Sequence, residues 1–510
     1  MSSTEWATKL KRLGAGMSIT LGVLAQPVMA VEINECFVKD LASKVECGEL
    51  AVPLNYNAPE GDQLDIGFVR LPAFNGAGRK TPLFFLAGGP GQSATSLAAR
   101  INDMFSDVRS DRDIVLVDQR GTGRSAALEC DQEELDTLAP TSDIIDAEIL
   151  AKCVEQLPVG IEHFTTANAV RDFEAVREAL GLAKVSLYGG SYGSRAAIAY
   201  LALAGEHVEA VILDGISPPS VPIGLFGTSA AASFDLALSR CQQTPECAVR
   251  FPGLRDQFER VNGRLKAAPV EVTIPHPTTG KPELLRLWHG QFLNLVRLTL
   301  YDPGATALLP LLISEADAGN YQPLAALAVG ASGMADINIM LNLNIVCNED
   351  APRFTDATKA SDADNNFDRE MSHRLWQEAC ALMPRFSPEL GWMSVHGFLN
   401  PALLLSGQAD PVTPPSNGER AATLFQSARH VIAPHAAHIV ASSECGGKMI
   451  ASFLNNSDPS AIDSSCLDNA PAPRFVLDTM GSMSRSATKS TKNTKTTASE
   501  AATQSKKESP

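Results

Sequence analysis

A serine flanked by glycines is the strongest chemical signal in this sequence. The segment Gly189-Gly190-Ser191-Tyr192-Gly193 follows an apolar run and precedes a helical pattern. A Gly-x-Ser-x-Gly segment in that setting is typical of a sharp strand-to-helix turn, which lifts the serine hydroxyl out of a sheet. The start of the new helix favours negative charge beside the serine. We therefore predict that Ser191 is the nucleophile of a serine hydrolase.

Such a nucleophile needs a base, and the base needs an acid that orients it. In sheet proteins with this strand-to-helix turn, the three catalytic residues occur along the chain in the order serine, acid, histidine. Asp410 stands just past an apolar run at Ala402–Leu405, at the end of a predicted strand where catalytic groups gather. His435 and His438 both follow closely, and the residue types alone leave open which of them is the base.

The negative charge that develops on a reacting carbonyl oxygen is stabilised by hydrogen bonds from two backbone amides. One belongs to Tyr192, the residue after the nucleophile. The other is predicted in the loop Ala87-Gly88-Gly89-Pro90-Gly91-Gln92, and we expect it to be that of Gly89. A phosphate loop is the alternative, but the required Lys-Ser/Thr pair is absent. The nearby segment Asp118–Ser125 is interpreted as a brace for the site.

Short apolar runs alternate with helical patterns along much of the chain. The runs are of the length expected for strands that are buried on both faces, as in a parallel sheet. They lie at Leu83–Leu86, Ile114–Val117, Val185–Tyr188, Ala210–Leu213 and Ala402–Leu405. The pattern lapses over 219–395, which is mainly helical. We predict an α/β-hydrolase fold, a mostly parallel sheet flanked by helices, with core segments at 31–218 and 396–478 and a helical cap inserted at 219–395.

The two ends of the chain have their own compositions. Lys9, Lys11 and Arg12 precede an apolar run that ends in Val28-Met29-Ala30, which predicts a signal peptide over 1–30. A buried helix or a membrane anchor is the alternative, but the run is short for a bilayer. Residues 479–510 are rich in Ser, Thr and Lys and are expected to be disordered. The protein is thus expected in the periplasm or outside the cell, without stable membrane insertion.

Ten cysteines follow the predicted signal, as five pairs of near neighbours. In an oxidising compartment we expect them to form disulfides in chain order. Zinc is the rival interpretation, but no Cys-x-x-Cys segment or paired Cys/His cluster is present, so neither a metal nor another cofactor is expected. The formal net charge of −16 argues against a nucleic-acid partner.

Four segments together resemble the prolyl and tripeptidyl aminopeptidase family of α/β hydrolases, and most closely its secreted tripeptidyl branch. They are Gly-Gly-Pro-Gly at 88–91, Asp-Gln-Arg-Gly-Thr-Gly-Arg-Ser at 118–125, Gly-Gly-Ser-Tyr-Gly at 189–193 and Asp-Pro-Val-Thr-Pro at 410–414. The resemblance implies a triad of Ser191, Asp410 and His438, since the spacing from Asp410 fits the family better for His438 than for His435. Two positions depart from the family pattern, Ala437 before the histidine and Ala87 before the glycine loop.

The resemblance also implies an exopeptidase acting on peptide substrates. Such an enzyme needs a negative group for the substrate's free ammonium, and Cys347-Asn348-Glu349-Asp350 resembles an acidic motif of the family's cap. Glu349 is therefore a candidate for binding the amine. An esterase for small acyl esters could use the same triad, and a catalytically silent binding protein is a third hypothesis.

Overall fold

The structure is a computed structural model, and it describes residues 31–76, 80–128, 130, 146–275, 280–331, 337–365, 367–369 and 371–478. The predicted signal peptide over 1–30 and the predicted disordered tail over 479–510 lie outside these residues. Within them, no helix is long and apolar enough to cross a membrane.

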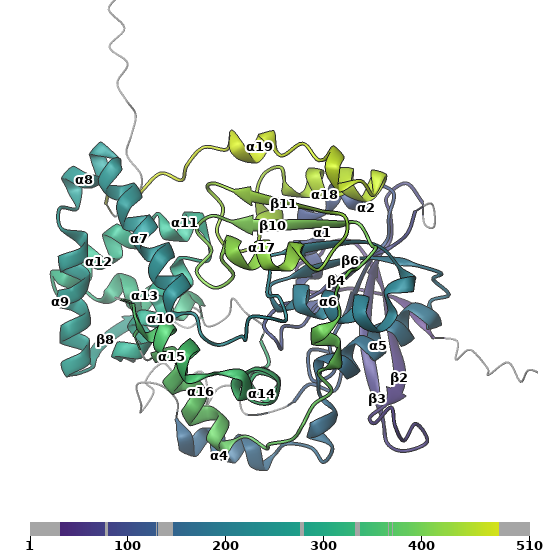
Figure 1. Cartoon of the computed structure of the whole chain (residues 1–510). Helices are drawn as coiled ribbons and strands as arrows, with labels where there is room; N and C mark the ends of the chain where they lie inside the picture. Colours follow the sequence, from purple (N-terminus) through teal and green to yellow (C-terminus); the bar gives the residue numbers. More distant parts are fainter. Residues whose placement is uncertain are drawn as a thin grey trace, which may run out of the picture.

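A nine-stranded sheet forms the centre of the molecule (Figure 1). Its strand order is β1-β2-β3-β5-β4-β6-β7-β10-β11, antiparallel from β1 to β5 and parallel from there to β11. The strands are β1 (Ile33–Cys36), β2 (Val45–Pro53), β3 (Gln63–Leu71), β4 (Leu83–Leu86), β5 (Ile114–Val117), β6 (Val185–Gly190), β7 (Val208–Asp214), β10 (Ala402–Gly407) and β11 (Ala428–Ala433).

The five predicted apolar strands are the middle of this sheet. Every residue of β4, β5, β6 and β10 is buried, because helices cover both faces. One face packs on α5 (Thr166–Ala179) and α6 (Tyr192–Ala204), the other on α1 (Ala98–Met104), α2 (Ser106–Arg109) and α18 (Gly446–Asn456). The predicted α/β fold class with a mostly parallel sheet is confirmed.

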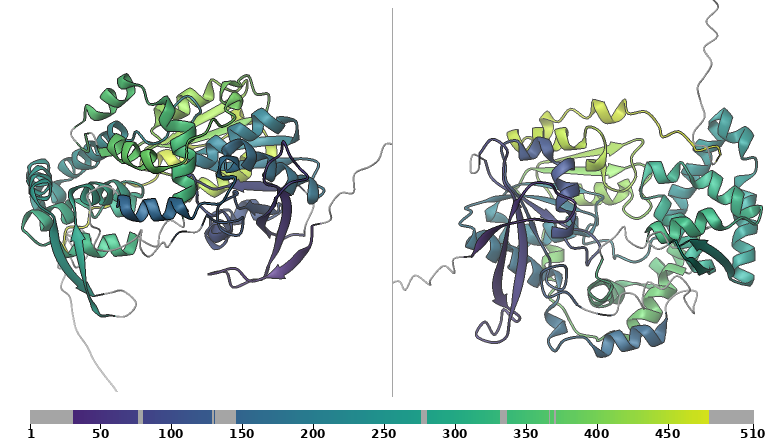
Figure 2. Two further views of the ribbon diagram at one scale, coloured as in Figure 1. Left: turned by 90° about the horizontal axis from the view of Figure 1, so that it is seen from below. Right: turned by 180° about the vertical axis from the view of Figure 1, so that it is seen from behind.

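The segment between β7 and β10 leaves the sheet and forms a cap beside it (Figures 1 and 2). Its helices are α7 (Gly227–Gln243), α8 (Pro245–Arg250), α9 (Leu254–Ala267), α10 (His289–Thr299), α11 (Pro303–Thr306), α12 (Leu309–Asp317), α13 (Gln322–Ala331), α14 (Ile339–Ile345), α15 (Asp356–Ala363) and α16 (Met371–Leu382). A hairpin of β8 (Val270–Pro275) and β9 (Pro282–Leu287) interrupts the helices and was not foreseen.

The cap has two parts with different packing partners. The helices from α7 to α13 surround a hydrophobic cluster of their own, centred on phenylalanines such as Phe234, Phe258 and Phe292. In contrast, α14 and α16 contribute Leu341 and Trp376 to the main cluster under the sheet. The second part of the insertion is therefore continuous with the core around the sheet.

The chain after α19 (Ser465–Asp468) returns from the core to the cap, as an extended segment that both views show (Figures 1 and 2). We call residues 471–478 the C-terminal strap. Phe475, Val476 and Leu477 pack against the cap cluster, and the Val476 amide donates to the Ala307 carbonyl at 2.9 Å. The strap thus links the core around the sheet to the cap.

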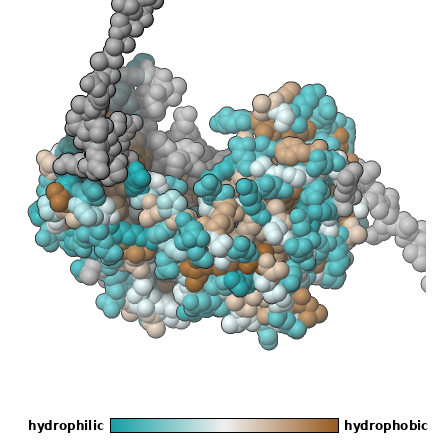
Figure 3. All heavy atoms as spheres, turned by 90° about the horizontal axis from the view of Figure 1, so that it is seen from above, coloured by the Kyte–Doolittle hydropathy of each residue, from teal (hydrophilic) through white to brown (hydrophobic). Residues whose placement is uncertain are grey.

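Five disulfides pair the cysteines in chain order, as predicted. They are Cys36–Cys47, Cys130–Cys153, Cys241–Cys247, Cys347–Cys380 and Cys445–Cys466. The face seen from above mixes hydrophilic residues with small hydrophobic patches (Figure 3). Such a mixed face is ordinary for a globular protein.

Candidate active site

Ser191 lies in the turn between β6 and α6, in a backbone conformation that few non-glycine residues adopt (φ 57°, ψ −126°). The flanking glycines allow this turn, because a Cβ on Gly189 would lie 2.2 Å from the Gly193 carbonyl oxygen, and one on Gly193 would lie 2.1 Å from that of Leu86. The Ser191 amide donates to the Asp214 carbonyl at 2.8 Å. The sequence motif therefore forms the strained strand-to-helix turn expected from it.

Asp410 and His438 form a buried hydrogen-bonded pair at the carboxyl end of the sheet. His438 Nδ1 lies 2.9 Å from Asp410 Oδ2, and the Thr413 hydroxyl donates to the same oxygen at 2.6 Å. The Val412 and Thr413 amides donate to Asp410 Oδ1. Four donors therefore fix this carboxylate toward the imidazole ring.

Charge and burial act in opposite directions on this pair. Burial raises the pKa of Asp410, but the His438 imidazolium and the Thr413 donors more than offset it, so the pKa is lowered from its ordinary value. Burial disfavours the charged form of His438, but Asp410 outweighs that effect and raises its pKa. Asp410 thus stays ionised while His438 becomes a stronger base.

The imidazole of His438 is held from two further directions. Its backbone amide donates to the Tyr301 carbonyl at 3.1 Å, and the two rings meet edge to face at 5.0 Å. On the other side lies Gly215, where a Cβ would come within 3.0 Å of His438 Cε1. The orientation of the ring is fixed by a cap residue and a core residue together.

Ser191 and His438 are neighbours along the edge of the sheet. Gly190 precedes the serine, and a Cβ placed on it would lie 3.2 Å from a side-chain carbon of Ile439, the residue after the histidine. Asp410 and His438 are thus joined directly, and Ser191 lies close to the segment that carries His438. Among the described residues, His435, the other candidate base, has no hydrogen-bond partner at its Nδ1.

Asp214 is a buried residue of the site that sequence reasoning missed. Its carboxylate accepts hydrogen bonds from the Val440 and Ala441 amides, each at 2.8 Å, and from the Tyr188 hydroxyl at 2.9 Å. Burial raises its pKa to about 6, although these donors oppose the rise. Asp214 therefore anchors the segment that follows His438. The sequence feature that could have identified Asp214 is an acidic residue at the end of β7, the strand that pairs with β6.

The loop after β4 approaches the nucleophile closely. A Cβ on Gly88 would lie 3.1 Å from Ser191 Cβ, and Gly89 has a φ of 105° that favours glycine. The Gly88 amide donates to the Gln92 side chain at 3.3 Å. Among the hydrogen bonds between described residues, none uses the amide of Gly89 or of Tyr192 as donor. Both predicted oxyanion donors thus remain available to a substrate.

Asp118 braces this loop from the next strand. It accepts from the Ser93 hydroxyl, the Thr95 amide and hydroxyl, and the Arg124 amide. The brace interpreted from the Asp118–Ser125 segment has this physical basis: one buried carboxylate fixes the chain that follows the glycine loop.

Glu349 lies in a π-helical turn of the cap, η4 (Val346–Asp350), and is only 2% exposed. Its two carboxylate oxygens accept from the Thr166 amide at 2.8 Å and the Thr166 hydroxyl at 2.6 Å. That hydroxyl also lies 2.7 Å from the Tyr192 hydroxyl. Burial raises the pKa of Glu349 to about 7, against the effect of the Thr166 donors. The predicted amine-binding residue is thus linked to the residue after the nucleophile.

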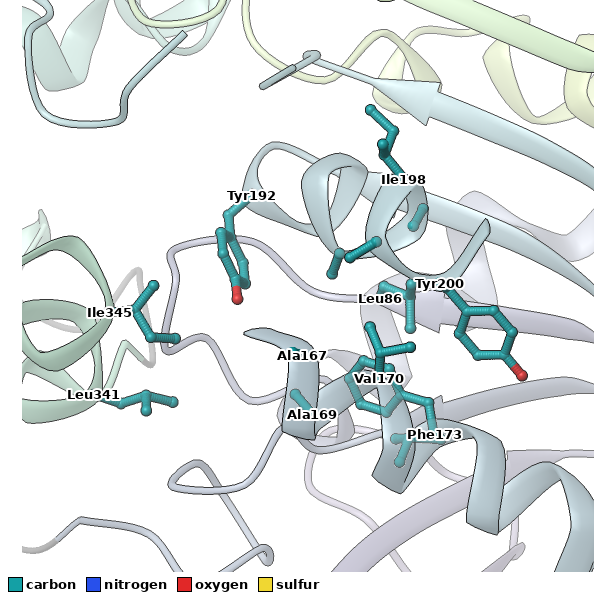
Figure 4. Packing of buried hydrophobic residues seen from close by; sticks show 14 of the residues in the cluster. Leu86, Ala167, Ala169, Val170, Phe173, Tyr192, Ile198, Tyr200, Leu341 and Ile345 are labelled. Atoms are coloured by element: carbon teal, nitrogen blue, oxygen red, sulfur yellow. The ribbon is translucent and has the colours of Figure 1, made fainter. Parts of the chain in front are cut away.

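The ring of Tyr192 runs from the start of α6 toward the start of α5, where its hydroxyl meets Thr166, and the cap helix that carries Leu341 and Ile345 lies beside it (Figure 4). Asp350, next to Glu349, binds Arg195 of the same helix α6 at 2.6 Å, and both side chains are fully buried. Arg353 lies 2.7 Å from Asp350 as well. The cap turn and the nucleophile helix therefore share a buried polar network.

The described residues contain no group of three or more His, Cys, Asp or Glu side chains that could hold a metal ion. The polar groups at the candidate site are the Ser191 hydroxyl, the His438 imidazole with Asp410, and the amides of Gly89 and Tyr192. A set of this kind is typical of acyl transfer.

Comparisons with known proteins agree with this fold. Residues 81–244 match the family described as alpha/beta hydrolase fold, and residues 365–466 match the family described as TAP-like protein. The chain therefore has the fold of the α/β hydrolases, and the resemblance to the tripeptidyl aminopeptidases is confirmed.

Three curated relatives are similar over part of their length. The chain is 28% identical to the tripeptidyl aminopeptidase of Streptomyces lividans over 198 residues, 36% of this chain and 37% of that protein. It is 31% identical to the serine protease Hip1 of Mycobacterium tuberculosis over 195 residues, 35% of this chain and 37% of that protein. It is 30% identical to carboxylesterase B of Mycobacterium tuberculosis over 241 residues, 42% and 46% of the two chains. Each match spans less than half of the relative.

Proposed function

We propose that this hydrolase is an exported serine aminopeptidase that releases short N-terminal pieces, including tripeptides, from peptides. The observation that carries the proposal is the buried His438–Asp410 pair, with a 2.9 Å hydrogen bond, beside the strained turn of Ser191. The names of the aminopeptidase and protease relatives support a peptide substrate.

In the proposed reaction, Ser191 Oγ attacks the carbonyl carbon of the scissile bond while His438 Nε2 takes its proton. The carbonyl oxygen becomes negative and accepts from the Gly89 and Tyr192 amides. His438 then protonates the leaving nitrogen, the carbon–nitrogen bond breaks, and an acyl-enzyme remains. Water, deprotonated by His438, attacks the ester carbon and releases the N-terminal piece and Ser191. Asp410 stabilises the imidazolium in both steps.

The proposed anchor for the substrate ammonium is Glu349. In the described part of the chain, no cation lies within ion-pair distance of this buried carboxylate, whereas Asp350 beside it has both Arg195 and Arg353. A substrate ammonium would supply the missing positive charge. Because both oxygens are bonded to Thr166, binding requires that at least one of these hydrogen bonds is exchanged.

A cavity of about 260 Å³ in the cap is the proposed pocket for the released residues. It is lined by Phe226, Arg297 and Trp376, among others. Arg297 belongs to α10 (His289–Thr299), and Tyr301, whose carbonyl and ring contact His438, follows the end of that helix. The support for a pocket here is this connection along the chain.

An esterase for small acyl esters is the second candidate, favoured by the similarity to carboxylesterase B. The test is turnover of chromogenic tripeptide, prolyl and acyl-ester substrates by the wild type and by Ser191→Ala, with Ser361→Ala as a control on an exposed serine. Turnover of free-amine peptides supports the aminopeptidase, and turnover of esters alone supports the esterase. Retained activity in Ser191→Ala, or no turnover and no labelling of Ser191 by a fluorophosphonate, would reject both.

Glu349→Gln tests the anchor. The variant should raise KM for free-amine peptides far more than for N-blocked esters, because only the first group carries the ammonium. Equal effects on both substrates would reject this role for Glu349.

Export is proposed from the predicted signal peptide over 1–30, with support from the five disulfides. N-terminal sequencing of the protein recovered from the periplasm or the medium should begin at Val31. A cytoplasmic protein that retains Met1 would contradict the proposal.

A further inference from the structure

A second cavity, of about 190 Å³, lies behind the loop that carries His438. Its walls come from α7, α11, that loop and the C-terminal strap, whose course from the core to the cap is visible in Figure 1. Ala409 and Ala437 line it, and each immediately precedes a member of the acid–base pair. The cavity therefore adjoins the two segments that carry Asp410 and His438.

Arg240 and His435 are the two ionisable side chains that line this cavity. The Arg240 guanidinium donates to the Pro434 carbonyl at 2.7 Å, and no carboxylate of the described residues lies within ion-pair distance of it. Burial lowers its pKa, as expected for a cation without an acidic partner. His435 Nδ1 is buried and lacks a hydrogen-bond partner among the described residues. The Arg240 guanidinium and His435 Nδ1 could therefore each bind an acceptor group of a ligand.

The remaining walls are mostly apolar. They include Ala237, Pro303, Ala307 and Phe475. Mostly apolar walls around the half-buried Arg240 cation are complementary to a molecule with an apolar body and one negative group. With one cation and mostly apolar walls, the cavity suits a ligand with a single negative charge better than a highly charged one such as a polyphosphate.

We propose that this cavity is a binding site for a small aliphatic monocarboxylate. The carboxylate accepts from Arg240 and from His435 in its Nδ1–H form, and the chain lies against Ala237 and Phe475. The cavity volume of about 190 Å³ has room for a small aliphatic acid, and hexanoate is the probe we choose for it. The site is independent of the proposed peptidase activity.

The test is isothermal titration calorimetry of the full chain with sodium hexanoate at neutral pH and constant ionic strength, with methyl hexanoate beside it. The acid should bind with one site, and the ester should not bind, because it lacks the negative charge. Arg240→Gln should weaken binding about 10-fold or more, since a charge-assisted hydrogen bond is lost. Arg250→Gln removes a charge from the exposed surface of α8 and should bind as the wild type does.

Ala237→Leu is the second variant, because it fills the cavity and keeps Arg240. It should lose binding while circular dichroism shows the wild-type fold. The proposal is overturned if hexanoate does not bind the wild type, if the ester binds equally well, or if Ala237→Leu and a folded Arg240→Gln both bind like the wild type. None of these outcomes depends on turnover, so failure of the proposed peptidase function would be separate.

Discussion

Exchange of Glu349 for glutamine should change the pH dependence of stability by an amount that the structure sets. The pKa of this carboxyl rises from 4.5 to about 7 on folding because it is buried, which corresponds to about 3 kcal/mol at 1.36 kcal/mol per unit. The folded state therefore holds the proton more tightly. This contribution to stability is fully present below the unfolded pKa and is lost as the pH rises through about 7.

The variant lacks this titration. It also loses one acceptor for Thr166, which costs about 1–3 kcal/mol at every pH. The free energy of unfolding of the wild type minus that of Glu349→Gln should thus be positive near pH 5. It should fall by about 2.5 kcal/mol between about pH 5 and about pH 8.5. Asp214 and Asp362 titrate near pH 6 in both proteins, so their effects cancel in the difference.

Urea unfolding followed by tryptophan fluorescence, with the disulfides intact, gives both free energies. Glu60→Gln, on an exposed glutamate, is the matched control for the exchange itself. A difference for Glu349→Gln that changes by less than about 0.5 kcal/mol over the same range would refute the reasoning from burial.

Three further outcomes are expected. The kcat/KM of the wild type should fall at acid pH with an apparent pKa above the ordinary 6.5 of histidine, because Asp410 raises the pKa of His438. An apparent pKa below 6.5 for this fall in kcat/KM would contradict the prediction. Asp410→Asn should lower kcat about 10⁴-fold. Arg195→Gln breaks a fully buried ion pair and should cost about 3–5 kcal/mol in urea unfolding, whereas a loss under about 1 kcal/mol would show that the pair is dispensable. Replacing Cys347 and Cys380 by serine opens a 33-residue loop and should cost about 4 kcal/mol by the same measurement; unchanged stability would argue against the loop-entropy account.

The central strands were predictable because their physical setting is simple. A strand such as β5 is buried on both faces and therefore appears as a continuous apolar run. The first three strands lacked that signal. In β2, Glu46 and Glu49 alternate with buried residues, and the antiparallel pairing that makes this pattern a strand comes from distant partners.

The site divides in the same way. Ser191, Asp410 and Gly89 could be predicted since each lies in a local motif at the end of a strand. The contact of Glu349 with Thr166 joins residues 183 positions apart, and the bond of Asp214 to the Val440 amide spans 226. No local pattern records such pairs, because they depend on how the cap and the segment after His438 fold back onto the core.

The buried pair of Arg195 and Asp350 has a consequence for engineering. Arg195 belongs to the helix that begins just after Ser191, whereas Asp350 belongs to the inserted cap, so the boundary between the two units runs through a salt bridge with no exposed atoms on either side chain. A chimaera that exchanges 219–395 for the cap of another hydrolase would leave Arg195 as an unpaired buried charge unless the new cap brings an acid to that position. In this protein a new cap must therefore be chosen together with the residue at position 195, the fourth after Ser191.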